Sequence, residues 1–510
     1  MKDTSKPDYQ GEEFSEFFPL WKKVDTCLGG TEAFRSAVEK GGESEYLPQF
    51  PLEHDDSYAY RLATSTFLPA YGDALDMIVG AITRKPPMLT MDGKKGVPAS
   101  IAADWENIDN AGTHWTVFAQ RLLRSGVHLG AAFVLTEMPP KPDGQLDRAQ
   151  AEAINFRPFS ILYSAKELAD WPIYVIVDGA PILQQIRFRE EAVTLDGFAE
   201  VEVERYRVWR VPVEADEQGN FHRAGNAEWE IWEEQEVADQ TARRRGKKKT
   251  ELVIIASGVS PLADIPVAVF NANPCHDDPR ETEGPVLIDL ANQNIKHYQL
   301  TSDHEKILHK CAPTLTTTNL REENGLVELA GADYRLDCAE GGSADWIEPS
   351  GSSLAERREW IAAVEKQMLE MGASLFTEGS AKAAMTAEEV RQRSGAKQSR
   401  ISQIAEAWKD CLETMLMHFA MWKGEATGGE ITPGVKSEDL VIPANELATV
   451  SGMVEKHQHS LKTLWAIERK LGILPDDFSD ENELAQIAKE MAMMPKPEPV
   501  IQPQPMGATA

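Results

Sequence analysis

The spacing of apolar residues predicts helices in the first quarter of the chain. Over residues 46–84 apolar side chains recur at the intervals of a helix, with one break at Pro69. Two further helices are expected over 101–126, followed by a short apolar strand over 130–136. Residues 1–45 are rich in Gly and Glu, and we expect them to form an N-terminal arm ahead of this region.

Between residues 155 and 270 the pattern changes to short β-branched or aromatic runs separated by turns. This pattern predicts an antiparallel sheet, with strands at Tyr174–Val177, Gln185–Phe188, Ala199–Val211, Glu228–Trp232 and Leu252–Ile255. The strongest basic cluster of the chain, Arg243–Lys249, lies inside this region. A solvated hairpin tip is favoured over a phosphate-binding patch, because charge runs usually only solvate a loop.

Two long helices are expected after the sheet. Pro285 opens the first, which can run to Cys311 and would be about 40 Å long. Its first half carries an apolar stripe that includes Leu290, Ile295 and Tyr298, whereas its second half is mostly polar. A helix whose far half lacks an apolar face is a poor monomeric element, so we expect it to stand beside copies of itself.

Short β-type pieces separate this helix from a second one, which is expected from Ser353 to about Met371 with a capping pattern at its start. Further helices are expected over 386–423, 445–470 and 481–494. The proline-rich tail, 495–510, is expected to be disordered.

The charge balance and the cysteines restrict the class of protein. The chain has 510 residues with 82 Asp and Glu against 52 Lys and Arg, a net charge of -30. Such a surface repels DNA at long range, which disfavours a free duplex-binding protein but not one that lets DNA slide past. The five cysteines are widely spaced, as in a protein folded in a reducing cytoplasm, and no apolar run is long enough to cross a membrane.

The signatures of catalysis and metal binding are missing. The sequence has no phosphate-binding Gly-x-x-x-x-Gly-Lys-Ser/Thr loop, no Gly-x-Ser-x-Gly elbow and no His-Glu-x-x-His motif. His297 and His304 are seven residues apart without a carboxylate at ligand spacing, so solvated or interface histidines are favoured over a metal site. We therefore expect no catalytic residue, no metal and no cofactor.

Residues 386–404 are similar to a repressor-type helix-turn-helix. Gly395 would form the turn, and Gln398, Ser399 and Ser402 would face the groove of DNA. The alternative is a pair of helices interrupted by Gly395. The alternative is favoured, because the following helix runs on to Trp422 and its surroundings carry no excess of basic residues.

Several segments in a characteristic order point to a known family. They are Tyr58–Thr64, Ile78–Pro87, Asn107–Gly112, Arg157–Phe159, Asp289–Tyr298 with Ser302-Asp303, and Met371–Ala373. With these segments the chain resembles the portal proteins of tailed bacteriophages from about Tyr46 to Lys423, and within them a branch catalogued as a domain of unknown function.

The resemblance implies an α+β portal fold, mainly helical, divided along the chain. Residues 46–283 would form the wing, helical over 46–126 and β-rich over 155–270. The remaining parts would be the first stem helix (284–311), a β-containing clip (312–351), the second stem helix (352–371), wing helices with the tunnel loop (372–424), and a helical crown (425–494).

The resemblance also implies a function without catalysis. The chain would form a ring, usually of twelve subunits, at one capsid vertex of the virion after synthesis in the host cytoplasm. Double-stranded DNA would pass through it without sequence specificity. Partners would be the major capsid protein, the large terminase and a head-completion or neck adaptor protein, but no membrane.

Particular residues are implied for two of these roles. The clip residues that dock the motor and neck would be Asn319, Leu320, Arg321, Glu322, Glu323 and Asn324. The tunnel loop nearest the DNA would include Gly379, Ser380 and Lys382, its only basic residue. The other function class left open is a cytoplasmic regulator that binds DNA through residues 386–404.

Overall fold

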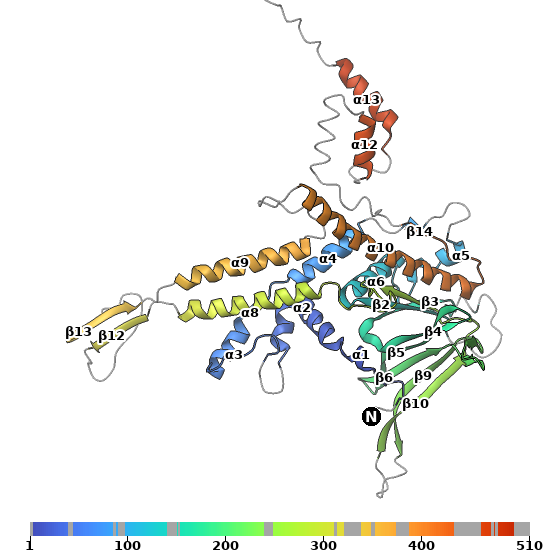
Figure 1. Ribbon diagram of the computed structural model, residues 1–510, viewed down its shortest axis with the longest axis horizontal. Helices are drawn as coiled ribbons and strands as arrows, with labels where there is room; N and C mark the ends of the chain where they lie inside the picture. The colour runs from blue at the N-terminus through green and yellow to red at the C-terminus, as the bar shows by residue number, and fades with distance from the viewer. Residues whose placement is uncertain are drawn as a thin grey trace, which may run out of the picture. The chain divides into compact units, whose positions relative to one another are not determined.

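The computed structural model describes residues 4–38, 44–84, 88–89, 97–139, 150, 154–238, 248–310, 314–320, 338–347, 352–373, 387–432, 461–470, 474 and 478–493. The chain divides into two compact units, residues 1–435 and 436–510. Helices and mostly antiparallel strands occupy largely separate stretches, so the fold class is α+β (Figure 1).

The first part of the chain forms a helical layer with a shared core. It comprises α1 (Glu12–Ser15), α2 (Phe18–Ser36), α3 (Asp55–Thr64) and α4 (Ala70–Ile82), and the expected break at Pro69 is confirmed because this residue precedes α4. The expectation of an N-terminal arm is wrong for residues 11–38. Phe14, Trp21 and Phe34 are at most 1 % exposed, so this segment completes the core. A short helix with one apolar side gives only a weak helical pattern in the sequence, but this side becomes fully buried when another element packs over it.

A small sheet lies next to these helices. The expected helices over 101–126 are α5 (Ala99–Ala102), a single 3-10 turn (Trp105–Asn107) and α6 (Trp115–Leu129). The expected strand is β2 (Ala131–Glu137), the centre of an antiparallel sheet with β3 (Phe159–Ser164) and β11 (Val267–Asn271). Both α6 and the long helix α10 (Ala387–Lys423) pack against it, which explains why β2 is apolar at nearly every position.

Close packing of α6 on this sheet depends on Gly126. A Cβ at this position would lie 2.3 Å from two ring atoms of the fully buried Phe270 in β11. Gly126→Ala is therefore expected to lower the free energy of unfolding by about 1–3 kcal/mol, measured by urea denaturation.

The matched control is Gly80→Ala in α4, where an added Cβ meets no atom within 4 Å. Helix propensity predicts that this substitution stabilises the protein by up to about 1 kcal/mol. If both substitutions changed stability alike, the steric explanation for Gly126 would be wrong.

The strands of the large sheet lie within the predicted β-rich region, and all the predicted strands except Ala199–Val211 extend further than the sequence runs indicated. Its order is β10-β9-β6-β5-β4-β8-β7, antiparallel except for the contact of β4 with β8. The strands are β4 (Leu168–Val177), β5 (Ala180–Asp196), β6 (Ala199–Arg210), β7 (Val213–Ala215), β8 (Phe221–Arg223), β9 (Glu228–Ala238) and β10 (Lys248–Val259). The ladder of β9 with β10 begins at Ala238 and Lys248. Lys248 and Lys249 of the basic cluster are the first residues of β10, and residues 243–247 lie outside the described ones.

The region expected as a crown over 425–494 does not begin at residue 425. Ile431 is 2 % exposed and pairs with Leu89, joining β14 (Ile431–Thr432) to β1 (Met88–Leu89) in the first unit. The second unit contains α12 (Leu461–Lys470) and α13 (Asp480–Met493), where the rings of Trp465 and Phe478 meet at 5.5 Å. These helices match the end of the 445–470 prediction and the 481–494 prediction, and the tail 495–510 lies outside the described residues.

Within the described part of the chain, no helix has the length and apolarity required to span a membrane.

Candidate functional site: paired helices joined by a β-hairpin

Two long helices lie antiparallel in the first unit. They are α8 (Ile288–Lys310) and α9 (Ser352–Ala373), close to the bounds predicted for the paired helices (Figure 1). Gln293 donates to Gln367 at 2.7 Å, and Lys296 lies over the ring of Trp360 at 5.6 Å. Because later residues of α8 contact earlier residues of α9, the helices run in opposite directions.

A β-hairpin connects the two helices. β12 (Thr314–Leu320) pairs antiparallel with β13 (Cys338–Ile347), from Thr314 opposite Ile347 to Leu320 opposite Cys338. The end of α8 and the start of α9 lie at the same end of the helix pair, so the hairpin is attached there. Of the clip residues implied by the resemblance, Asn319 and Leu320 end β12, whereas Arg321, Glu322, Glu323 and Asn324 lie outside the described residues.

The apolar stripe of α8 is buried within the protomer itself. Leu290 is 2 % exposed, Ile295 9 % and Tyr298 0 %. The ring of Tyr298 lies 4.9 Å from that of Phe34 in α2 and 6.1 Å from that of Phe67. These three residues therefore anchor α8 to its own chain rather than to a neighbouring copy.

The polar second half of α8 is partly covered by its own chain. Ser302 bonds to Ser65 through their hydroxyls at 2.7 Å, and Lys306 pairs with Glu53. The Arg61 guanidinium of α3 lies 3.6 Å from the Asp303 carboxylate. That α8 also stands beside other copies stays a prediction, but counting only apolar residues missed that part of its polar half packs through paired charges.

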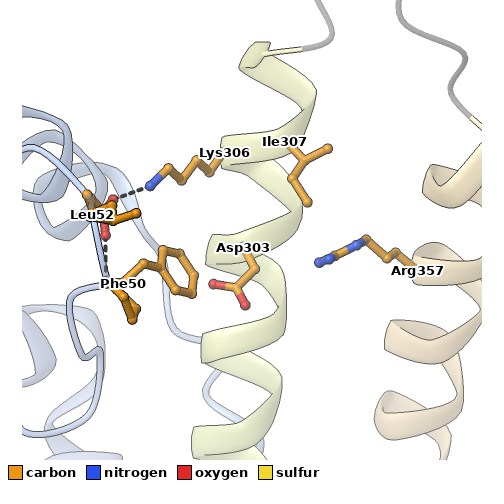
Figure 2. Close-up of a pocket in the computed structure, with 8 residues that line it drawn as sticks. Phe50, Leu52, Asp303, Lys306, Ile307 and Arg357 are labelled. Carbon is orange, nitrogen blue, oxygen red and sulfur yellow. Dashed lines mark hydrogen bonds and ion pairs between the residues drawn. The ribbon is translucent and has the colours of Figure 1, made fainter.

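Glu53 is the centre of this charge cluster, which we call the Glu53 cluster (Glu53, Arg61, Asp303 and Lys306). The Glu53 side chain is 1 % exposed and that of Arg61 4 %. Glu53 accepts a hydrogen bond from Arg61 Nη2 at 2.9 Å. It also accepts hydrogen bonds from the Phe50 amide at 3.0 Å and from Lys306 (Figure 2). The Phe50 ring lies 4.3 Å from the Arg61 guanidinium and 4.9 Å from the Lys306 ammonium.

The hydrogen bonds hold Glu53 in its charged form. Burial alone would raise the pKa of Glu53, but the bonds from Lys306, the Phe50 amide and Arg61 outweigh it and lower the pKa to about 2. Burial raises the pKa of Asp303, against the opposing charges of Arg61 and Arg357. Loop 46–53 and α3 are thus joined to α8 through the charged carboxylate of Glu53.

A cavity of about 310 Å³ adjoins the Glu53 cluster. Figure 2 shows Arg357 of α9 extending toward it from the far side of α8. The cavity is lined by Phe50, Pro51, Leu52, Glu53, Asp303, Lys306, Ile307 and Arg357. Nothing in the spacing of these residues along the sequence indicated that they would meet, because they come from three separate segments.

His297 and His304 of α8 are not free in solvent. His297 is 5 % exposed, and its Nε2 atom lies 3.1 Å from the Glu365 carboxylate of α9. His304 is half-buried. Over the described residues, no group of three or more His, Cys, Asp or Glu side chains is placed to hold a metal ion.

Both interpretations of residues 386–404, the helix-turn-helix and the favoured pair of helices interrupted by Gly395, are wrong. α10 is one helix from Ala387 to Lys423, and Gly395 lies inside it rather than in a turn. The indoles of Trp408 and Trp422 donate to the carbonyls of Ala119 and Thr136, each at 2.9 Å, and fasten α10 to α6 and β2. The tunnel-loop residues Gly379, Ser380 and Lys382 fall between α9 and α10, outside the described residues.

A comparison with known protein families matches some of these elements. Residues 286–423, which span α8 to α10, match the family model described as "Domain of unknown function (DUF4055)". No curated protein matches the chain.

Solved structures similar to the chain include two from gene transfer agent particles. A chain of "Neck of empty GTA particle computed with C6 symmetry" is 13% identical with a TM-score of 0.35, over 82% of this chain and 90% of that one. A chain of "Virion of native gene transfer agent (GTA) particle" is 12% identical with a TM-score of 0.36, over 82% of this chain and 89% of that one.

Proposed function

We propose that this chain is the portal subunit of a tailed-phage particle, a ring component through which double-stranded DNA enters and leaves the capsid. The observation that carries the proposal is the α8–β12–β13–α9 unit: two long antiparallel helices with a β-hairpin attached at one end. Copies of this unit around an axis would surround a channel with helices and present a circle of hairpins at one rim.

The charge of the chain supports a conduit for DNA rather than a DNA-gripping protein. With a net charge of -30 for each copy, a ring carries a strongly negative field. Neutralising phosphates with basic residues makes DNA binding tight and salt-dependent, which would oppose sliding. A negative wall keeps the duplex from adhering.

The proposal assigns roles to the parts without any catalytic step. The β12–β13 hairpin would dock the large terminase during packaging and the neck adaptor afterwards, and the wing would contact the major capsid protein. The tunnel loop with Lys382 would lie closest to the DNA. The mature protein would reside at a capsid vertex of the virion, after assembly in the host cytoplasm.

The purified full-length chain is expected to form closed rings with a central hole. A ring of twelve copies would have a mass of about 680 kDa, twelve times the 56.6 kDa of one chain. Analytical ultracentrifugation measures this mass, and negative-stain images show the hole. A monomer at micromolar concentration across a range of salt conditions would contradict the proposal.

A further inference from the structure

One wall of the cavity beside the Glu53 cluster carries a cation that its own chain does not neutralise. The cavity, of about 310 Å³, lies between loop 46–53, α8 and α9, and Arg357 of α9 extends toward it (Figure 2). The Arg357 side chain is half-buried and forms no ion pair or hydrogen bond with any residue that the structure describes. Asp303 is paired with Arg61 instead, at 3.6 Å. The Arg357 guanidinium is therefore available to a carboxylate from another molecule.

The opposite wall of the same cavity exposes apolar side chains. Leu52 is 102 % exposed and Phe50 39 %. Leu52 also has a φ of 67°, a left-handed backbone conformation that is unfavourable for a residue with a bulky side chain. A strained residue that holds an apolar side chain out into water indicates a surface that another molecule covers.

The other side of α9 carries a complementary surface. Glu359 is exposed and forms no ion pair within the described part of the chain. Two residues separate it from Arg357, which is about 200° around a helix, so the two side chains leave α9 on nearly opposite sides. The residues around Glu359 on this outer face of α9 are small and exposed: Ala355, Ala362 and Ala363.

This arrangement has the geometry that a ring requires. A closed ring joins two different surfaces of the same chain, and they must lie on opposite sides of each copy. Rotation about the ring axis keeps every residue at its height along that axis. In the proposed ring α9 runs along the axis, and Arg357 and Glu359 differ in height by only about 3 Å, the rise of two helical residues. Rotation therefore brings Glu359 of one copy to the level of Arg357 of the next.

We propose that the cavity of one copy receives the outer face of α9 from the adjacent copy, with Glu359 bound to Arg357. The occupant is a second copy because the two surfaces are complementary in charge, one with an unpaired guanidinium and the other with an unpaired carboxylate. The alanines around Glu359 leave room for Leu52 and Phe50 to pack against the helix. The proposal rests on the ring of the proposed function and names one of its subunit contacts.

The experiment reverses each charge in the full-length chain. Arg357→Glu and Glu359→Arg are each expected to lower the fraction of chains in rings by about tenfold or more, because every contact then holds two like charges. A chain with both substitutions is expected to recover rings, because the pair is restored with its charges exchanged. This recovery can arise only between copies, since the two side chains lie on opposite sides of α9. Sedimentation velocity and negative-stain imaging measure the fraction in rings.

Matched controls carry the same charge changes elsewhere. Arg84→Glu and Glu217→Arg alter exposed side chains that form no ion pair in the described part of the chain. Both controls should assemble like the unaltered protein. Circular dichroism checks that all variants are folded.

A further variant tests the apolar part of the contact. Leu52→Asn removes the exposed apolar side chain, and Asn adopts a positive φ more readily than Leu, so the fold is expected to be retained. The fraction of chains in rings should nevertheless fall severalfold. The matched control is Phe198→Asn, which removes a side chain that is 108 % exposed and does not line the cavity, and should leave rings unchanged.

Three results would overturn the inference. Rings that persist in both single charge reversals exclude this contact while leaving the proposed function intact. If each reversal abolishes rings but the chain with both does not recover them, Arg357 and Glu359 do not pair with each other. If the unaltered protein is monomeric, the inference fails together with the proposed function.

Discussion

Glu53→Gln is expected to lower the free energy of unfolding by about 3–5 kcal/mol. The substitution keeps the shape of the side chain but removes the nearer of the two carboxylates that face the Arg61 guanidinium, which is 4 % exposed and keeps only Asp303 at 3.6 Å. Removing one partner of a buried ion pair costs this much because the other charge remains desolvated. Lys306, which also pairs with Glu53, loses the same partner.

Urea denaturation of the full chain measures this effect. The matched control is Glu32→Gln, whose side chain is 81 % exposed and pairs with Arg35 on the surface of α2. This control is expected to change stability by less than about 0.5 kcal/mol. Similar losses in both variants would show that the Glu53 cluster does not stabilise the fold.

The stability that Glu53 contributes should depend on pH in one direction. Its pKa of about 2 in the folded protein is below the ordinary value of 4.5. The unfolded chain therefore takes up a proton first as the pH falls, so the contribution is complete above about pH 4.5 and is lost toward pH 2. Glu53→Gln should lack this part of the pH dependence, and an unchanged profile would contradict the assignment.

Deleting Arg321–Asn324 is expected to leave rings intact and to abolish DNA packaging, with filled heads reduced at least a hundredfold. The deletion begins after Leu320 because this residue pairs with Cys338 at the end of the β12–β13 ladder. The hairpin is thereby retained, and only the connection between its strands is shortened. If the connection between β12 and β13 binds the packaging motor, DNA packaging fails although the ring is complete.

Ring mass and the yield of filled heads are measured together for this variant. An equal deletion of Lys141–Gly144, in the segment between β2 and β3, is the matched control and should package normally. Normal packaging after deletion of Arg321–Asn324 would show that the packaging motor docks on a surface other than the hairpin. Loss of rings would show that the connection has a structural role instead.

Part of the fold followed from local pattern. α8 and α9 were predicted within a few residues because Pro285 marks the start of one and helical spacing continues through both. β2 and five strands of the large sheet (β4, β5, β6, β9 and β10) were predicted in the same way, whereas β7 and β8 were not. The periodic spacing of apolar residues shows which face of a helix or strand differs from the other, and α8 and α9 each have such an apolar face.

Gly395 shows where local signals mislead. Gly in a helix costs about 1 kcal/mol relative to Ala, which suggested a turn. α10 continues through it because buried residues such as Ile404, Trp408 and Leu412 hold the later turns against α6 and the small sheet. The free energy gained by burying these residues exceeds the local cost of one glycine in the helix.

By itself the sequence determined the α+β class, the two long helices and the first strand between them, because each depends on the order of residues within one segment. Only the tertiary structure decided that residues 11–38 belong to the core, and that Glu53 and Arg61 form ion pairs with the polar half of α8. It also decided that β5 and β6 extend past the strands beside them. These features depend on which distant segments come into contact. A charged residue far away in the sequence produces no periodic pattern around the residue whose charge it neutralises.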